Sequence, residues 1–439
     1  MAFRLDQSNI HLVKNPIFRE YAMNYQRIYD DFMANVEEFG MPFAENHEQE
    51  IQELRRKLST MGVISRNEGA SLANGDVCGA CAACRTGEGS YTGLISLMCH
   101  RNCFFCFNPN QNEYDHLAES KKDWKQELEQ VYRHQPQLRY IALTGGEPLL
   151  HKADALEFFR MAKQLWPQVS MRLYTSGDLL DEPMAQQLAE VGLEEIRFSL
   201  KLEDTPEQME KVYAAMETAK RYLPRVMVEM PVLPDKEPEM RGILDRLEQM
   251  GVFGINLLEL CFPFANAQAF RARGYELRNP PYRTLYNFWY AGGLPVDGSE
   301  LLSLKLLCYA MEKKYSLTVH YCSLENKHFG QIYMQNLGAK PGASYVMSEK
   351  DFYLKTIKAF GKDVPRAERI LREHHRREFR VDRENGFIQM APACASLLKG
   401  TGMEMAVSYN VCEMRGGELC VRELRLDAVK AAEFDAGVL

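Results

Sequence analysis

Hydrophobic and polar positions follow a repeating order through the middle of the chain. Short apolar, β-branched or aromatic runs lie at 92–98, 139–144, 170–175, 195–201, 225–232 and 254–261. Amphipathic stretches such as ADALEFFRMAKQLW and EPEMRGILDRLEQM separate them. Strands that alternate with helices in this way indicate a parallel sheet with crossover helices. Six such units fit an open (β/α)6 barrel, although periodicity alone does not separate a barrel from a doubly wound sheet.

The pattern changes on both sides of this region. Residues 17–60 look helical and polar, whereas the chain after 262 mixes loops, a helix near 299–314 and short strands, the first at 317–322. We therefore expect an α/β protein: a partial (β/α)6 TIM-like barrel with an N-terminal helical segment and a C-terminal α+β extension. The expected segments are a helical segment (1–77), an auxiliary-cluster loop (78–94), the barrel core (95–265) and the extension (266–439).

Composition and charge narrow the classes of function. The chain is 46% hydrophobic and 26% charged, with a net charge of −7, which is typical of a globular protein and disfavours a large nucleic-acid surface. The N-terminus lacks the apolar core of a signal peptide, and no run approaches the roughly 20 apolar residues of a membrane span. We expect a cytoplasmic protein, so its 12 cysteines indicate metal binding rather than disulfides.

Three cysteines follow the first expected strand. Cys99, Cys103 and Cys106 have the spacing Cys-x3-Cys-x2-Cys. Three thiolates on one loop can ligate three irons of a cubane and leave the fourth iron open for chemistry. The alternative is a zinc knuckle, which this spacing fits poorly because zinc sites favour two Cys-x2-Cys pairs.

The next expected strand ends in Gly145-Gly146-Glu147-Pro148. Two glycines let the backbone approach a ligand closely. An ordinary strand-ending turn explains this motif when it stands alone. A chance origin is much harder to accept when the two motifs stand at successive strand ends, where barrels carry their catalytic loops.

With CHRNCFFC and TGGEP, residues 95–262 resemble the radical S-adenosylmethionine superfamily. The resemblance implies that Cys99, Cys103 and Cys106 hold a [4Fe–4S] cluster, whose open iron binds S-adenosylmethionine. Cleavage of the sulfonium C–S bond then gives methionine and a 5′-deoxyadenosyl radical, which takes a hydrogen atom from the substrate. The resemblance also implies cofactor-binding residues, namely Phe105, Gly145, Gly146 and Glu147.

The ends of the third and fourth strands offer further ligands for the cofactor. Hydroxyls of Thr175, Ser176 and Ser199 can bond ribose or carboxylate oxygens, and Lys201 can neutralise the carboxylate. Each of these residues could instead cap a helix or face solvent.

A second cysteine run lies upstream. Cys78, Cys81 and Cys84 have the ferredoxin-like spacing Cys-x2-Cys-x2-Cys, which suits three ligands of a second [4Fe–4S] cluster, with zinc as the competing metal. Read together with VHYCSLENKHFGQIYMQN, this region resembles uncharacterised proteins related to pyruvate formate-lyase activating enzyme. That resemblance implies Cys322 as the fourth ligand.

The other cysteines have different expected roles. The sequence departs from the narrower family at Cys261, where an acidic residue is expected. Cys308 lies in an apolar helical run and should belong to the core. Cys394, Cys412 and Cys420 form no Cys-x2-Cys pair, so structural or free thiols are favoured over a third cluster.

Two residues near the end of the sixth strand are candidate catalytic groups. Glu259 and Cys261 alternate onto one face of the strand. If that face points inward, the thiol could donate a hydrogen atom and the carboxylate could bind an amine or remove a proton. The alternatives are a small buried residue for Cys261 and an interior salt-bridge partner for Glu259.

The expected activity is hydrogen abstraction from a substrate, with a peptide or protein side chain as the leading hypothesis. A small-molecule biosynthetic enzyme and an activase of a glycyl radical enzyme are the alternatives. The second cluster suits a step that accepts or relays an electron. The resemblance also implies a reducing partner such as flavodoxin or ferredoxin.

Overall fold

The computed structural model describes residues 2–6, 8–281 and 293–439. The chain forms two compact units. The large unit includes residues 41–281 and 293–328, and the small unit includes the chain up to residue 40 together with residues 329–439. Within the described ranges, no helix is both long and apolar enough to cross a bilayer.

The large unit is built on one open sheet. Its strands, in their order across the sheet, are β2 (Ile64–Arg66), β3 (Ser71–Ala73), β12 (Thr318–Cys322), β9 (Gly254–Glu259), β8 (Arg225–Val232), β7 (Glu195–Phe198), β6 (Ser170–Thr175), β5 (Tyr140–Thr144) and β4 (Ser90–Leu94). From β4 to β9 each strand pairs in parallel with the next strand in the chain. The expected order of six parallel strands is therefore confirmed.

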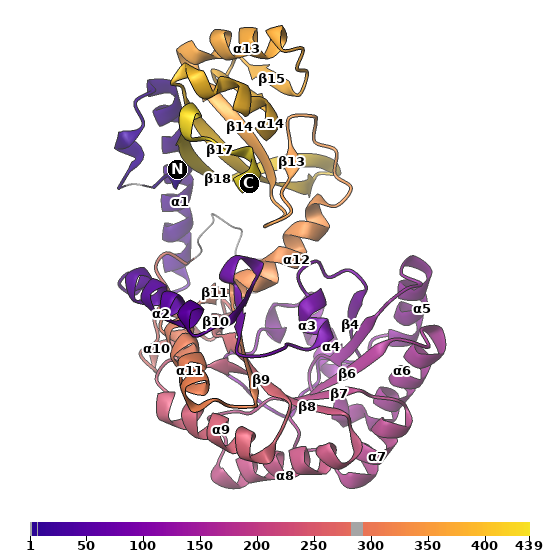
Figure 1. The fold of residues 1–439 in the computed structure, drawn as a ribbon. Helices are drawn as coiled ribbons and strands as arrows, with labels where there is room; N and C mark the ends of the chain where they lie inside the picture. Colours follow the sequence, from indigo (N-terminus) through magenta and orange to yellow (C-terminus); the bar gives the residue numbers. More distant parts are fainter. Residues whose placement is uncertain (1, 7, 282–292) are drawn as a thin grey trace. The chain divides into compact units, whose positions relative to one another are not determined.

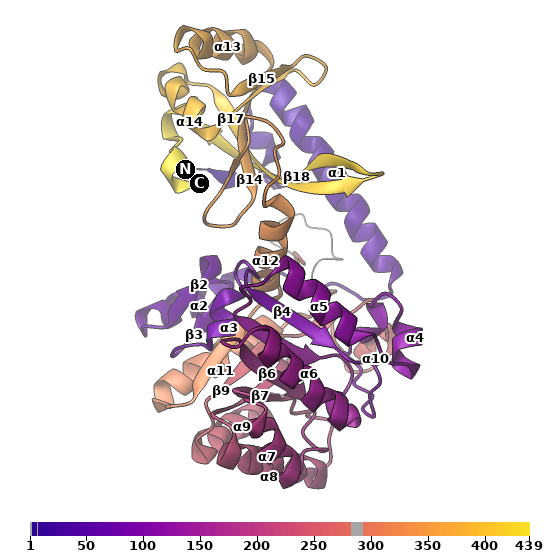
Figure 2. The ribbon, with the colours of Figure 1, turned by 90° about the vertical axis from the view of Figure 1, so that its right-hand side faces the viewer.

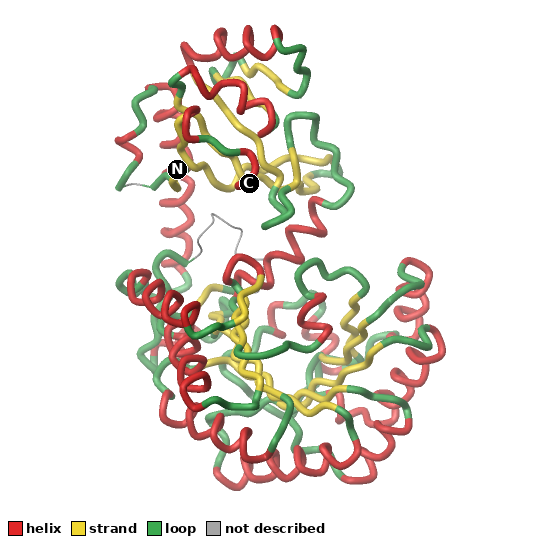
Figure 3. Tube along the Cα trace, in the orientation of Figure 1, coloured by secondary structure: helices red, strands yellow, loops and turns green. Residues whose placement is uncertain are grey.

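Helices cover the outer, convex face of this curved sheet (Figures 1 and 3). They are α2 (Glu48–Thr60), α5 (Trp124–His134), α6 (Lys152–Leu165), α7 (Glu182–Glu190), α8 (Pro206–Tyr222), α9 (Glu237–Met250) and α11 (Ser299–Lys313). Side-chain oxygens of Asp123, Asp181 and Thr205 accept backbone N–H groups at the starts of α5, α7 and α8, which fixes where these helices begin.

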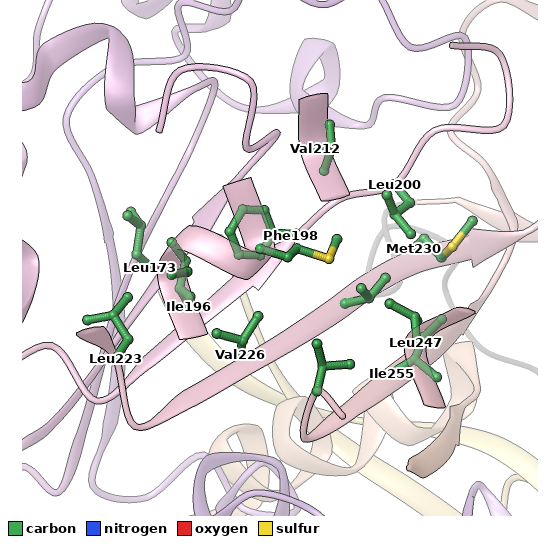
Figure 4. Close-up of a cluster of buried hydrophobic side chains, with 14 of the residues drawn as sticks. Leu173, Ile196, Phe198, Leu200, Val212, Leu223, Val226, Met230, Leu247 and Ile255 are labelled. Carbon is green, nitrogen blue, oxygen red and sulfur yellow. The ribbon is translucent and has the colours of Figure 1, made fainter. Parts of the chain in front are cut away.

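The hydrophobic core lies between the convex face and the helices (Figure 4). In β8, Val226 and Val228 belong to this core, whereas Glu229 lies on the opposite, concave face. Because side chains alternate along a strand, each strand gives one set of residues to the core and another to the concave face. Cys308 is buried in the core on α11, as expected.

Two sequence expectations differ from the structure. The first strand ends at Leu94 rather than at residue 98, because Ser96 and Met98 accept hydrogen bonds from the loop that follows β5. Residues 1–77 are not only helical. Strands β2 and β3 extend the sheet beyond β12, which pairs in parallel with β9 and antiparallel with β3.

The small unit is an antiparallel sheet with helices on both faces (Figure 2). Its strands, in spatial order, are β1 (Phe3–Arg4), β18 (Glu418–Lys430), β17 (Glu404–Arg415), β14 (Leu354–Phe360), β16 (Phe387–Met390) and β15 (Phe379–Asp382), with β13 (Val346–Met347) beside β14. Helix α1 (Pro16–Glu38) packs against Phe360 and Phe387. Helices α13 (Val364–Glu373) and α14 (Pro392–Ala395) pack on the other face, against Ile357 and Met390.

Candidate functional site

A cavity of about 580 Å³ lies at the carboxyl ends of the parallel strands of the large unit. This volume falls within the usual range of small-molecule sites. Its lining includes every residue expected to bind the first cluster or S-adenosylmethionine. These residues are Cys99, Cys103, Phe105, Cys106, Gly145, Gly146, Glu147, Thr175, Ser176, Ser199 and Lys201. Residues from four strand ends therefore meet at one place.

The two glycines bring the end of β5 against the loop that carries the first cysteines. A Cβ on Gly146 would lie 2.0 Å from the Met98 carbonyl oxygen, and Gly145 has a φ of +117° that side chains rarely adopt. The amides of Gly146 and Glu147 donate to the carbonyls of Ser96 and Met98 at 3.1 and 2.8 Å. Glycine is needed here for close packing of backbone against backbone.

The Glu147 carboxylate links the end of β5 to the end of β6. It accepts hydrogen bonds from Thr175 Oγ1 at 2.7 Å, from Ser176 Oγ at 2.7 Å and from the Ser176 amide at 2.6 Å. The Leu149 amide donates to it as well, at 3.0 Å. A buried carboxylate requires such compensation. Glu147 is therefore held by the protein, and it fixes the positions of Thr175 and Ser176.

Other polar residues, which sequence reasoning missed, anchor the first cysteine loop. Asn108 Nδ2 donates to the Gly145 carbonyl at 2.8 Å. His100 Nε2 lies 2.8 Å from Asp178 Oδ2, and Arg101 pairs with Asp178 and Asp204. The histidine and arginine lie within the cysteine motif and the asparagine lies just after it. This closeness in the sequence could have indicated that they hold the cysteine loop in place.

Lys201 lines the same cavity as the three cysteine thiols. Burial raises the pKa of Cys103 to about 11, and the Lys201 ammonium acts in the opposite direction. Burial likewise raises the pKa of Cys99 and of Cys106, and Lys201 opposes both shifts. Thiols must lose their protons to ligate a metal, so a nearby cation favours the ligating form.

The upstream cysteines lie on the concave face of the sheet, in and around α3 (Gly79–Ala83; Figure 1). The Cys81 amide donates to Cys78 Sγ at 3.3 Å, so Cys78 caps this short helix. Hydrogen bonding with the Cys78 sulfur and the positive charge of Arg197 hold the pKa of Cys81 well below its usual range.

Cys322 ends β12 close to this loop. Burial raises the pKa of the Cys322 thiol to about 12; Lys327 opposes the shift, and the sulfurs of Cys84 and Cys81 add to it. Asn326 Nδ2 donates to Cys322 Sγ at 3.2 Å. The Cys322 thiol therefore lies within electrostatic range of Cys84 and Cys81, although it is far from them in the sequence.

Glu259 and Cys261 do not line the cavity. Glu259 shares a face of β9 with the core residues Ile255 and Leu257, where it accepts from Arg278 Nη1 and from the Leu324 amide, both at 2.8 Å. Burial raises the pKa of the Glu259 carboxyl, and Arg278 opposes the shift. Cys261 lies in β10 (Cys261–Phe262), which pairs with β11 (Leu294–Pro295).

Within the described part of the chain, no three His, Cys, Asp or Glu side chains converge as ligands of one metal ion. Ligands of a single zinc ion would converge with sulfur–zinc distances of about 2.3 Å. The cysteine ligands of a cubane differ, because each one binds a separate iron.

Comparison with known proteins agrees with the geometry of the cavity. Residues 94–247 match the family model described as "Radical SAM superfamily". A Methanocaldococcus jannaschii protein named "Putative glycyl-radical enzyme activating enzyme MJ0021" is 23% identical over 248 residues, which cover 55% of this chain and 62% of that protein. A PqqA peptide cyclase of Gluconobacter oxydans is 31% identical over 109 residues, which cover 24% of this chain and 29% of that protein.

Among solved structures, one match is Streptococcus suis SuiB bound to the precursor peptide SuiA. That match has a TM-score of 0.39 and 12% identity, and it covers 62% of this chain and 52% of SuiB. The chain spans less than two thirds of the length of each of these relatives.

Proposed function

We propose that this chain, a member of the radical SAM superfamily, is an enzyme that reductively cleaves S-adenosylmethionine and abstracts hydrogen from a substrate held by its partial (β/α)6 barrel. One observation carries the proposal. Cys99, Cys103 and Cys106 share a cavity with the Gly145-Gly146-Glu147 strand end. When bound there, a [4Fe–4S] cluster and S-adenosylmethionine supply the electron and the 5′-deoxyadenosyl radical.

The protein residues orient the cofactor in this proposal. Lys201 neutralises the carboxylate of S-adenosylmethionine, and Ser199 hydrogen-bonds an oxygen beside it. Backbone groups of Gly145 and Gly146 would hold the methionine amino group, and Phe105, within the cysteine loop, would lie beside the cofactor. Because the hydroxyls of Thr175 and Ser176 donate to Glu147, these two residues shape the wall of the cavity and keep the end of β5 in place.

A second [4Fe–4S] cluster, ligated by Cys78, Cys81, Cys84 and Cys322, is part of the proposal. Two observations support a buried anionic group at these cysteines. The Nε atom of Arg172 is buried, and none of the described residues forms a hydrogen bond with it. Arg172 also lies near enough to Cys84 to lower the pKa of its thiol, against the raising effect of burial. Zinc is the competing occupant.

The substrate in this proposal is a peptide or protein side chain, and the similarity to a PqqA peptide cyclase supports it. Activation of a glycyl radical enzyme is the second candidate, which the relative from Methanocaldococcus jannaschii favours. A small-molecule substrate is the third. A flavodoxin or ferredoxin would supply the electrons.

The test is anaerobic reconstitution with iron and sulfide, followed by reduction and assay for 5′-deoxyadenosine. The wild-type chain should form it, and Cys103→Ala should abolish its formation. Cys308→Ala is the matched control, because Cys308 is buried in the core away from the cavity lining. Equal turnover by Cys103→Ala and wild type would refute the proposal. Peptides encoded beside the gene can then be assayed for a mass change that depends on S-adenosylmethionine.

A further inference from the structure

A row of polar side chains crosses the concave face of the sheet beneath the upstream cysteines. Strand pairing sets Tyr174 beside Arg197, and it sets Asn256 between Glu229 and His320. Barrel interiors are normally filled by apolar side chains, and buried charges are costly unless they are paired. A polar row in this place therefore calls for a specific explanation.

Arg197 is the centre of this row, and its side chain is 2% exposed. Its Nε donates to Glu195 Oε1 at 2.7 Å, and its Nη1 donates to Glu229 Oε2 at 2.5 Å. Two carboxylates already neutralise the guanidinium. Its third nitrogen, Nη2, faces sulfur instead, at 2.8 Å from Cys78 Sγ and 3.3 Å from Cys81 Sγ. Arg197 also lines the 580 Å³ cavity, so one rigid side chain borders both sites.

A second chain of hydrogen bonds reaches the same cysteine loop from strands β3, β12 and β9. Ser71 Oγ lies 2.8 Å from His320 Nε2, and His320 Nδ1 lies 2.9 Å from Asn256 Oδ1. The amide of Asn256 then donates to Glu229 Oε2 at 2.8 Å and faces Cys81 Sγ at 3.6 Å. Cys81 therefore receives donors from two strands, β7 and β9.

We infer that Arg197, assisted by Asn256, is a positioning residue that orients Cys78 and Cys81 and raises the reduction potential of the second cluster. The inference rests on the proposed second cluster. Reduction adds negative charge to a cluster, and hydrogen bonds to its cysteine sulfurs stabilise the reduced form. The Arg197 N–H groups make these hydrogen bonds in a buried interior, where hydrogen bonds are stronger than in water.

The experiment compares two arginines on the same face. Arg225 pairs with Glu195 at 3.2 Å, and Arg197 pairs with the same carboxylate at 2.7 Å, but no hydrogen bond among the described residues joins Arg225 to a cysteine sulfur. Each is changed to lysine in the full-length reconstituted protein, which keeps the charge but removes the guanidinium fork. Midpoint potentials are measured by EPR-monitored redox titration, and the second cluster is assigned as the signal that persists when Cys99, Cys103 and Cys106 are alanine.

Arg197→Lys should shift the second cluster to a more negative potential, while Arg225→Lys leaves it at the wild-type value. At a fixed ambient potential the ratio of oxidised to reduced cluster should rise about tenfold, the equivalent of one charge-assisted hydrogen bond. Equal potentials in the two variants, with two clusters loaded, would overturn the inference and leave the proposed function intact.

Two further outcomes are decisive. If Arg197→Lys does not fold or load iron, Asn256→Ala replaces it, and a negative shift supports the inference whereas an unchanged potential overturns it. If the wild-type chain holds one cluster of about four irons, the second cluster is absent, and that part of the proposed function fails together with the inference.

Discussion

At the scale of single residues, the cavity depends on contacts between backbone groups. Gly146 packs against Met98 with no space for a side chain, and the Glu147 carboxylate receives three hydrogen bonds from the end of β6 and one from the Leu149 amide. Both features hold the end of β5 beside the cysteine loop. Small substitutions at these positions should therefore impair cofactor binding more strongly than they impair folding.

Gly146→Ala should impair the site because the new Cβ would meet the Met98 carbonyl at 2.0 Å. The backbone must move, at a cost of about 1–3 kcal/mol. We expect a lower melting temperature and weaker binding of S-adenosylmethionine by the reconstituted protein. Gly242→Ala in α9 is the control, since no atom that the structure describes outside the helix backbone lies within 4 Å of its added Cβ, and it should be neutral or slightly stabilising. Normal cofactor binding by Gly146→Ala would contradict this account.

Glu259→Gln should destabilise the large unit, because it weakens a buried pair with Arg278. The expected loss of unfolding free energy is about 1–3 kcal/mol, measured by chemical denaturation. Glu210→Gln removes one partner of an exposed pair with Arg246 and should leave stability unchanged. The catalytic role expected for Glu259 would instead require normal stability and a loss of product while 5′-deoxyadenosine still forms. Cys261→Ala tests the thiol by the same criterion.

At the scale of elements, β12 extends the sheet beyond the six parallel strands β4 to β9. It pairs with β9 in register, so His320 lies beside Asn256 and Cys322 beside Leu258. Leu258 lines the cavity, and the alternate residues Val319 and Tyr321 belong to the core. A strand end is a rigid position, which suits a metal ligand.

Cys322→Ala should lose or convert the second cluster while the first remains. The measurement is iron and sulfide content together with the EPR spectrum of the reduced protein. Cys308→Ala removes a buried thiol from α11 and should retain both clusters. If Cys322→Ala and Cys308→Ala have the same iron content and spectra, Cys322 is not a ligand.

At the scale of the whole molecule, one curved sheet serves both cysteine loops. Its concave face holds the upstream loop against Arg197, and its carboxyl edge holds the first motif in the cavity. The small unit has separate cores of its own on the two faces of its sheet. The proposal of one cluster at each cysteine loop of this sheet is tested directly by the iron content of the full chain.

The reconstituted chain should bind about eight irons, as two cubanes. Alanine at Cys99, Cys103 and Cys106 together should leave about half of that iron, and alanine at Cys78, Cys81 and Cys84 should leave the other half. Metal analysis of all three proteins checks this. Zinc bound at the upstream cysteines would show that the second cluster is wrong and leave the first untouched.

The sequence by itself determined the order of the six parallel strands and the positions of the two cysteine motifs and of the double glycine. These signals are local: apolar periodicity, ligand spacing within one loop and a residue type that permits close backbone approach. They also predicted which residues gather at the first site, because parallel strands end at one edge of the sheet.

Only the tertiary structure decided which face of each strand turns inward and which distant residues meet. Alternation put Glu259 and Cys261 on one face, but packing of Ile255 and Leu257 against the helices turns Glu259 into the core. Arg197 is one of many charged residues in the sequence, and its contact with Cys78 spans 119 positions. Such contacts depend on how the sheet curves and on what its two faces bury, and no local pattern of residues encodes that.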